Sequence, residues 1–455
     1  MESREINLNF KSEFIVIAVP AILENLVGVF ITAIDTRMIA PLGKTAVSAV
    51  SLTVQPKLLF LSVFYALGTA ASIYVSQALG RKDRKEANKY FHSVLSICIL
   101  LSVILGAGLA LLAGPVMRLF SRQQETLAMS ISFFRIIMGL MIFQTVSIVL
   151  NAALRGIGET RVTFVSSIFM GVVDILVNYM LIEGHWGFPA LGVDGDAIGT
   201  VAGTVAACAV SVYFLLRHSD FLTLRGIIKN IDRQSEVMLQ IRSKTGNLIF
   251  ENLFTRIGFL ISSLIISGLS AEATAVYFVA MILLNYTFSF GDGLHSAIVS
   301  LTGRSMGAGS EKDVRKFLRQ GRMVGLVVSI VLSIIYILGA KWFFGLYFTD
   351  SISVNKGLQY SYVAAVLTVL QILRLVNIAA MKGVGEVKIP RVLATACVML
   401  INPLTGYLLT YVLGYGVWGI WFSSLITQIV WCLMSFIKIN SCIETHLRAQ
   451  TPDKT

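Results

Sequence analysis

The chain has few charged residues and few cysteines for its length, and both shortages exclude certain classes of protein. Only 14% of its 455 residues are Asp, Glu, Lys or Arg, whereas 56% are hydrophobic, and the mean hydropathy is +0.78. Soluble globular proteins carry about 25% charged residues, so an ordinary soluble domain is excluded. The five cysteines stand alone without a Cys-x-x-Cys pair, which argues against a disulfide framework and against a zinc site.

The sequence also lacks the motifs of common enzyme classes. It contains no His-Glu-x-x-His, no Gly-x-Ser-x-Gly and no Walker-type phosphate loop. We therefore expect no enzyme, no bound cofactor and no direct use of ATP. The net charge of +12 is concentrated in particular loops, so it does not indicate a nucleic-acid partner.

The chain contains many long apolar segments. Each is long enough to cross a bilayer as a helix, and helices satisfy their own backbone groups in lipid. The short alternating strands of a membrane barrel do not occur. We predict an all-α integral membrane protein with twelve transmembrane helices, at residues 14–38, 50–79, 92–113, 129–153, 162–182, 197–216, 245–268, 274–303, 322–340, 358–381, 390–412 and 417–437.

The two halves of the chain repeat each other at a constant offset, which places position 24 opposite position 251. The sequence LENL at 23–26 returns as FENL at 250–253, and AALRGIGE at 152–159 returns as AAMKGVGE at 379–386. Repeated halves are typical of secondary transporters, whose substrate path lies between the halves. Because six spans per half is an even number, we predict two six-helix lobes related by a pseudo-twofold axis along the membrane normal.

Basic residues in short loops predict the orientation. The segments 80–91, 217–244 and 304–322 are rich in Lys and Arg, whereas 183–196 is poor in them and carries acids. Lys and Arg gather on the cytoplasmic side, so we expect a multi-pass protein of the inner (cytoplasmic) membrane with both termini in the cytoplasm. The predicted divisions are an N-terminal lobe 1–216, a cytoplasmic connector 217–244, a C-terminal lobe 245–438 and a cytoplasmic tail 439–455.

The comparison of halves sorts ionisable residues by role. Glu24 and Glu251 occupy matching positions, so we interpret them as structural residues near the inner face, with an inner-gate acid as the alternative. Asp35, in the first span, matches a serine in the second half, and Asp174 also has no acidic counterpart. Charges at membrane depth are costly and usually face a polar cavity with a function.

Asp174 and Asn178 are four residues apart, so they share one face of the fifth helix and could point at one ion. Oxygen ligands of this kind suit a hard cation or a proton held by a carboxylate. The second half has its own unmatched residues, which we regard as cavity candidates. Arg256 and Asp292 could form a structural ion pair, whereas His295 could relay protons or be a structural residue. Arg374 completes that set.

Three further residues of the first half have no counterpart in the second. Lys57 and Arg135 lie near predicted span ends, where long side chains reach toward the interface. Pro20 lies inside the first span. A bend there could couple ion binding at Asp35 to the shape of the cavity, or it could be a static kink.

Several short motifs, in their order and spacing, resemble the MATE (multidrug and toxic compound extrusion) family over about residues 14–438. They are Asp35 with the Leu-Gly pair at 42–43, VSQALG at 75–80, LRGIGET at 154–160, Gly-Leu at 293–294 and GAG at 307–309. The resemblance implies an antiporter of two lobes. It would export bulky, often cationic or amphipathic compounds, driven by inward Na+ or H+.

In that family, the coupling site of the first lobe uses an acid on helix 1, Asn/Asp positions on helix 5 and a hydroxyl on helix 6. Asp35, Asp174 and Asn178 fall on these positions and would be the ligands if the ion is Na+, and Thr200 is the matching hydroxyl. Many relatives carry Asn then Asp on helix 5, whereas this chain has Asp then Asn. Arg256 stands where NorM-type members carry an acid, so the resemblance is to the DinF-like bacterial type.

A second function stays open at this point. A flippase of lipid-linked saccharides or of another anionic amphiphile would share the two-lobe plan and favour cations in its cavity, which Arg135, Arg256 and Arg374 could supply. In either case we expect a small-molecule or amphiphilic substrate and the lipid bilayer as partners. A monomer already supplies both lobes.

Overall fold

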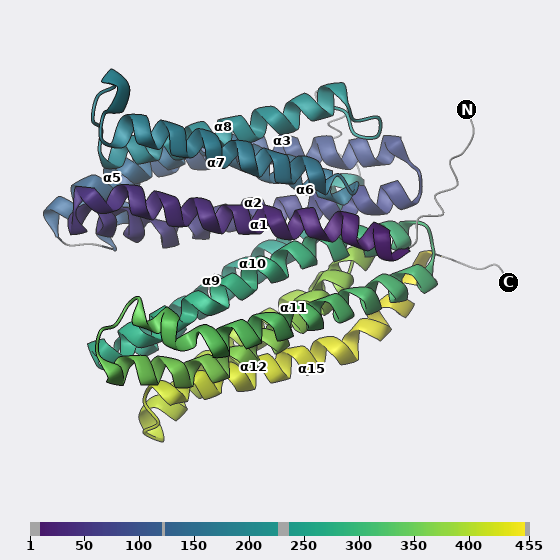
Figure 1. Ribbon diagram of the computed structural model, residues 1–455. Helices are drawn as coiled ribbons and strands as arrows, with labels where there is room; N and C mark the ends of the chain where they lie inside the picture. Colours follow the sequence, from purple (N-terminus) through teal and green to yellow (C-terminus); the bar gives the residue numbers. More distant parts are fainter. Residues whose placement is uncertain (1–9, 121–122, 226–235, 451–455) are drawn as a thin grey trace. The chain divides into compact units, whose positions relative to one another are not determined.

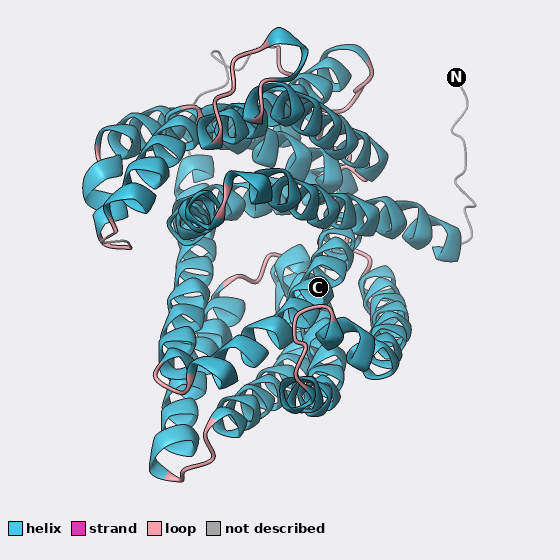
Figure 2. Cartoon of the chain, turned by 60° about the vertical axis from the view of Figure 1, so that its left-hand side comes forward, coloured by secondary structure: helices cyan, strands magenta, loops and turns pink. Residues whose placement is uncertain are grey.

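The computed structural model describes residues 10–120, 123–225 and 236–450, and these residues form helices and connecting turns without a β-strand (Figures 1 and 2). Within the described residues, eleven helices are long and apolar enough to cross a membrane. A bent pair of helices meets the same criteria as a twelfth span. The predicted all-α membrane fold with twelve spans is thus confirmed.

The helices follow the order of the predicted spans. In the first repeat they are α1 (Phe10–Ile39), α2 (Lys44–Gly80), α3 (Arg84–Leu111), α4 (Ala113–Arg118), α5 (Gln124–Gly139), α6 (Met141–Gly156), α7 (Thr160–Ile182) and α8 (Val193–Arg217). In the second they are α9 (Glu236–Ser267), α10 (Ala271–Gly307), α11 (Glu311–Gly345), α12 (Ser351–Val384), α13 (Lys388–Ala394), α14 (Asn402–Tyr407) and α15 (Val417–Gln450).

The chain divides into two compact units. One is Leu23–Ile249, which we call the first lobe; the other combines Met1–Ile22 with Phe250–Thr455, and we call it the second lobe. The division therefore falls inside α1 and inside α9, and the first lobe includes the described parts of the segment expected to be a separate connector. The expected boundaries, 1–216 and 245–438, differ from this division chiefly in the placement of Met1–Ile22.

The first turns of α1 pack as part of the second lobe. Phe14 and Ala21 are buried, and Glu13 forms an ion pair with Arg304 on α10. A Cβ atom built on Gly293 of α10 would lie 2.5 Å from the Cα atom of Ile22. Only a glycine permits the two helix backbones to approach so closely.

The repeat extends to the corners between helices. The corner after α2 has left-handed backbone at Lys82 (φ 57°), and the matching corner after α10 has it at Gly309 (φ 71°). The next residue in each case is an N-cap: the side chain of Asp83 accepts from the backbone of α3, and that of Ser310 accepts from the backbone of α11. Such caps satisfy amides that have no partner within their helix.

Two spans differ between the repeats. The fourth span, predicted as one segment, consists of α5 and α6 with a 50° bend around Leu140, whereas its counterpart α12 is a single helix. The eleventh span contains π-helical turns at Thr395–Ile401 and Leu408–Val412 around Pro403, whereas α7 is regular. Proline lacks an amide hydrogen and crowds the preceding turn, and wider turns relieve that crowding.

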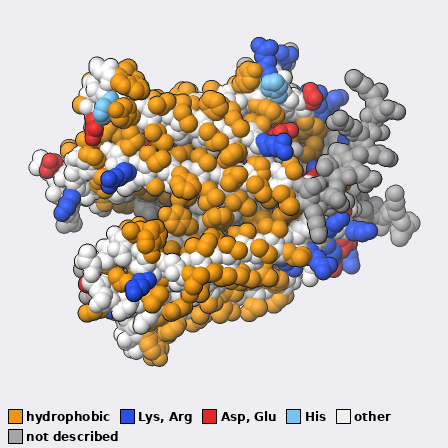
Figure 3. All heavy atoms as spheres, viewed as in Figure 1, with side chains coloured by type: hydrophobic (Ala, Val, Ile, Leu, Met, Phe, Trp, Pro, Cys, Tyr) orange, Lys and Arg blue, Asp and Glu red, His pale blue; other side chains and the backbone are white. Residues whose placement is uncertain are grey.

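The outer faces of the helices suit a lipid environment. Hydrophobic side chains cover the middle of the visible face of each lobe, and Lys and Arg gather toward the ends (Figure 3). Leu111, Leu338 and Trp342 have relative exposures of 81%, 79% and 71%. Apolar exposure on this scale is a liability in water, but it is what a bilayer-embedded surface requires.

Candidate functional site

The first lobe brings together the three polar residues expected to share an ion. The Asn178 amide on α7 donates to Asp35 Oδ1 of α1 at 3.3 Å and to Asp174 Oδ1 at 3.1 Å. Asp35 and Asp174 also interact with each other. The geometry is that of two carboxyl groups bridged by one amide.

A third acid joins this cluster, and the sequence did not identify it. Asp196 is buried near the start of α8 and interacts electrostatically with Asp35 and Asp174. Its Oδ1 atom has no hydrogen-bond partner among the described residues. The sequence placed Asp196 in an outer loop because the sixth span was predicted to begin at 197, whereas α8 begins at Val193.

Glycines on α8 determine how closely the polar residues of α7 approach it. A Cβ atom built on Gly199 would lie 2.0 Å from Asn178 Oδ1, and one built on Gly203 would lie 2.9 Å from Asp174 Cβ. Gly195 precedes them at the same four-residue spacing, so the three glycines form one face. This small-residue face is the sequence signal for close packing against α7 that could have pointed to the site.

Thr200 does not join the cluster. It lies on α8 beside Gly199 and is half-buried, and no hydrogen bond links it to Asp35, Asp174 or Asn178 in the described structure. Asp196, one turn earlier on α8, is the side chain of this helix that interacts with the acids.

Lys57 belongs to the surroundings of the same acids. It lies inside α2, several turns beyond the helix start at Lys44, and it is half-buried. It interacts electrostatically with Asp196, Asp174 and Asp35. α2 begins at Lys44, before the predicted start at residue 50, so Lys57 lies further from the end of its helix than the sequence indicated.

Across the described ranges, no group of three His, Cys, Asp or Glu side chains is arranged to hold a metal ion. The oxygens closest to that task are Asn178 Oδ1 and Asp196 Oδ1, which are buried without a hydrogen-bond partner in the described structure.

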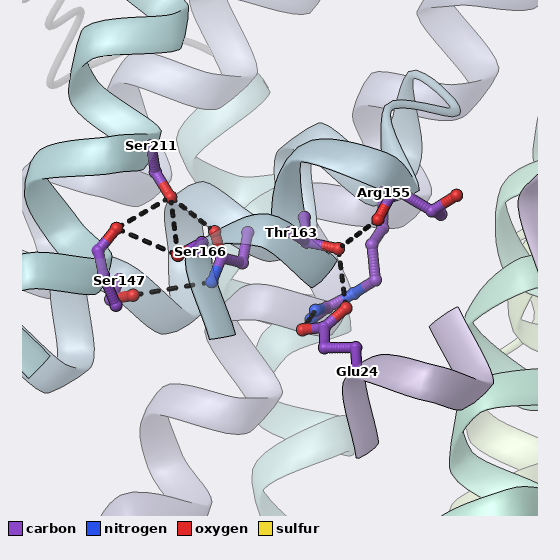
Figure 4. Close-up of polar contacts among 9 residues, drawn as sticks. Glu24, Ser147, Arg155, Thr163, Ser166 and Ser211 are labelled. Atoms are coloured by element: carbon purple, nitrogen blue, oxygen red, sulfur yellow. Dashed lines mark hydrogen bonds and ion pairs between the residues drawn. The ribbon is translucent and has the colours of Figure 1, made fainter. Parts of the chain in front are cut away.

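Both repeats carry an ion pair at the same positions. In the first lobe Glu24 Oε1 lies 2.7 Å from Arg155, and in the second lobe Glu251 Oε1 lies 2.9 Å from Lys382, at the matching position. These contacts favour the structural interpretation of both glutamates. Figure 4 shows Glu24 facing Arg155 and Thr163.

The two pairs differ at one oxygen. The Thr163 hydroxyl donates to Glu24 Oε2 at 2.6 Å, whereas the position that matches Thr163 in the second repeat is Pro390. Glu251 Oε2 is accordingly buried without a hydrogen-bond partner among the described residues. The first-lobe pair is the more completely satisfied of the two.

A polar network lies beside the first of these pairs (Figure 4). Ser211 on α8 donates to Asn151 Oδ1 on α6 at 2.6 Å, and Asn151 in turn donates to Ser147 at 3.5 Å. Ser166 on α7 donates to a backbone carbonyl of α8 at 3.0 Å. In lipid, buried polar side chains satisfied in this way fasten neighbouring helices to each other.

The second-lobe candidates do not form one cluster. Arg374 is buried, donates to Gln428 Oε1 at 3.0 Å and lies with its guanidinium 3.8 Å from the ring centroid of Trp431. Such stacking holds a desolvated arginine in place.

Arg256 and Asp292 are both exposed, and no ion pair joins them in the described part of the chain. They interact electrostatically over a longer range, and Asp292 also interacts with Arg374 and Lys382. The contact pair expected from their charges is therefore not formed among these residues. His295 is half-buried on α10, one turn after Asp292.

The duplicated helices and the buried polar cluster define a class, the multi-pass membrane transporters built from two repeated halves. The family model described as MatE matches residues 20–180 and 248–408, which is more than half of the chain. The chain therefore belongs to the MatE family and is a transporter rather than an enzyme. One match in each half confirms the duplication.

Individual relatives agree with this family. The chain is 25% identical over 329 residues to the probable multidrug resistance protein NorM of Thermotoga maritima, covering 72% of this chain and 70% of the relative. It is 21% identical over 303 residues to the FAD transporter of Shewanella oneidensis, covering 65% and 66%. A crystal structure of a MATE in complex with MaL6 has the same fold, with a TM-score of 0.89 at 16% identity over 97% of each chain.

Proposed function

We propose that this transporter exports bulky organic molecules across the cytoplasmic membrane in exchange for an inward-moving cation, H+ or Na+. The observation that carries the proposal is the contact of Asp35 and Asp174 through the Asn178 amide inside the first lobe. Two acids at membrane depth are too costly to be retained for structure alone when neighbouring hydroxyls and amides serve that purpose.

The coupling follows from the charge of the cluster. Two neighbouring carboxyl groups repel each other when both are ionised, and a cation arriving from outside, H+ or Na+, relieves that repulsion. If the cation binds one state of the transporter more tightly than another, its binding shifts the equilibrium between those states, and no other source of work is needed. The transporter would work as a monomer with both termini in the cytoplasm.

Multidrug resistance in the printed name of the Thermotoga relative supports cationic or amphipathic substrates. The named substrate of the Shewanella relative, FAD, is anionic and supports a second candidate, the export or flipping of anionic amphiphiles. The exposed Arg256 and the exposed Asp292 favour neither substrate class outright, but the second lobe has more cationic than acidic candidates.

The experiment is transport by purified protein in liposomes. Wild type and Asp35→Asn are compared under an imposed pH gradient and, separately, an imposed Na+ gradient, with ethidium as the cationic probe and FAD as the anionic one. Asp220→Asn is the matched control, because Asp220 is an exposed acid outside the spans. We expect gradient-driven ethidium transport that Asp35→Asn abolishes and Asp220→Asn retains.

Full transport by Asp35→Asn would refute the coupling role of the cluster. Transport of FAD without ethidium would replace the first substrate class by the second.

A further inference from the structure

Two arginines of the second lobe lie within its helix bundle without an acid in contact. Arg374 on α12 is 4% exposed, and Arg322 on α11 is half-buried. Within the described second lobe, neither guanidinium has a carboxylate at ion-pair distance. Asp292 and Glu251 interact with Arg374 only over a longer range, and Glu251 is already paired with Lys382. Because a buried charge is normally paired, Arg374 in particular lacks the counter-charge that its burial calls for.

Arg374 is held by neutral side chains that leave its outer fork free. Its Nε atom donates to Gln428 Oε1 on α15 at 3.0 Å, and its guanidinium stacks on Trp431. Among the described residues, its terminal nitrogens Nη1 and Nη2 have no hydrogen-bond partner. These nitrogens form the planar fork with which an arginine binds a carboxylate or phosphate through two parallel hydrogen bonds. Gln428 is half-buried, so the guanidinium lies one side chain away from the surface of the lobe.

The helices that carry these groups, α12 and α15, pack side by side (Figure 1). Arg374 contacts Gln428, and Asn377, one turn later on α12, donates to Ser435 Oγ, two turns later on α15, at 3.1 Å. Because both partners advance together, the two helices run in the same direction. Arg322 Nε donates to Asn377 Oδ1 at 2.8 Å, which brings the second guanidinium to the same place. We call this polar line of contact the α12–α15 seam.

Three further groups of the α12–α15 seam can donate but have no partner. Gln371 lies one turn before Arg374 on α12, and Thr427 lies one turn before Trp431 on α15. Gln371 Nε2, Thr427 Oγ1 and Trp431 Nε1 are buried, and throughout the described segments none of them has a hydrogen-bond partner. A buried donor without an acceptor is costly. The fork of Arg374 and these neutral donors therefore lack the same thing, an acceptor that carries negative charge.

The half-buried side chains next to this seam are apolar. Leu370 precedes Arg374 by one turn on α12, and Leu425 precedes Gln428 by one turn on α15. A molecule that places a charged group at Arg374 from this side passes these leucines. Sites with a few convergent polar groups among apolar walls suit ligands that have an apolar part as well. A bare hydrated anion would gain nothing from the leucines.

We propose that the α12–α15 seam binds the phosphate or carboxylate group of an amphiphilic anion, with the Arg374 fork as its main contact and Gln371 and Trp431 as neutral donors. The site goes beyond the proposed cation coupling, because binding in the second lobe requires neither a coupling ion nor export. The bound anion supplies the counter-charge that Arg374 lacks and the acceptors that the neutral donors lack. A bilayer phospholipid and a transported molecule share this chemistry.

The direct test is isothermal titration of octyl phosphate into the purified full-length protein in nanodiscs of phosphatidylcholine, which contain no acidic lipid. Octyltrimethylammonium has the same chain with a cationic head, and inorganic phosphate has the head without the chain, so both serve as reference ligands. Arg374→Gln removes the charge, whereas Arg374→Lys keeps the charge without the fork. Arg448→Gln, which removes an exposed arginine near the end of α15, is the matched control.

We expect wild type and Arg448→Gln to bind octyl phosphate equally, about tenfold more tightly than either reference ligand. Arg374→Gln should weaken this binding about tenfold, and Arg374→Lys by less, because the lysine keeps the charge. Gln371→Met removes the amide donor at similar volume and should weaken binding about threefold. In liposomes, faster entry of labelled octyl phosphate with wild type than with Arg374→Gln would identify a transported molecule as the occupant. Binding without such entry would identify a bilayer phospholipid, and both results support the site.

Equal affinity of wild type for octyl phosphate and octyltrimethylammonium would overturn the proposal. So would a folded Arg374→Gln protein, judged by its size-exclusion profile, that binds octyl phosphate as wild type does. Inorganic phosphate bound as tightly as octyl phosphate would overturn the assignment to an amphiphile. If Arg374→Gln does not fold, unchanged binding by Gln371→Met refutes the site and weakened binding supports it. Failure of ethidium export with octyl phosphate binding retained would refute the proposed function and leave this site intact.

Discussion

Gly199→Ala tests whether the close packing of α8 against α7 holds the acid cluster together. The new Cβ atom would lie 2.0 Å from Asn178 Oδ1 and 3.1 Å from the Asn178 backbone nitrogen. Ordinary contact begins at 3.4 Å, so the amide oxygen has to move away until that separation is reached. Because the backbone nitrogen is also too close, rotation of the side chain alone cannot relieve the overlap.

The cost can be worked out in two parts. Overpacking of this kind costs about 1–3 kcal/mol. For a unit of this size, each kcal/mol lowers the melting temperature by roughly 2–4 °C. The second part is functional: the Asn178 bonds of 3.3 Å and 3.1 Å are already long for N–H···O bonds, so displacement of the amide by the new Cβ atom breaks at least one of them.

The assay pairs thermal unfolding in detergent with gradient-driven export in liposomes. Gly108→Ala is the matched control, because Gly108 lies in the transmembrane helix α3 and an added Cβ would meet nothing within 4 Å. We expect Gly199→Ala to lower the melting temperature and reduce export several-fold, whereas Gly108→Ala keeps export and is as stable as wild type or slightly more so.

A wild-type melting temperature and wild-type export by Gly199→Ala would refute the reasoning. They would show that α7 and α8 accept the added Cβ atom without displacing Asn178. A lower melting temperature with normal export would separate the two effects. It would show that Asn178 does not hold the acids in their working positions.

Two further predictions concern the scaffold. Glu24→Gln leaves Arg155 without its counter-charge and should destabilise the first lobe by roughly 3 kcal/mol; adding Arg155→Met should restore part of this loss in thermal unfolding, and no recovery would contradict a specific pair. Asn88→Leu removes the two hydrogen bonds, 2.9 Å and 2.8 Å, that hold residues 221 and 223 against α3. Trypsin should then cut after the exposed Arg225 about tenfold faster, and an unchanged rate would show that other contacts hold this segment.

The sequence predicted the architecture well because that architecture occurs twice in the chain. Hydrophobic run length identified the spans. The offset between halves matched Glu24 with Glu251 as structural residues, but it did not indicate their basic partners. The four-residue spacing of Asp174 and Asn178 predicted that these two residues share one helix face. The family resemblance added Asp35 to the same site, and the hydrogen bonds of Asn178 join all three residues.

The sequence does not show where each helix begins, and this limited the prediction of the site. Asp196 was placed in a loop because hydropathy marks the apolar middle of a span, whereas α8 begins earlier, at Val193, and opens with polar residues. Arg256 and Asp292 were paired on charge alone, although contact also requires side chains on facing surfaces. The bend at Leu140 has no proline to indicate it.

The division inside α1 makes the two lobes nested along the chain rather than consecutive. The chain enters the second lobe, leaves it after Ile22, completes the whole first lobe and returns at Phe250, so two covalent crossings join the lobes. Cutting the segment 217–244 would leave them attached through α1. During synthesis the first lobe emerges complete while the second has only its opening turns, so the second lobe can finish folding only after the first is already in the membrane.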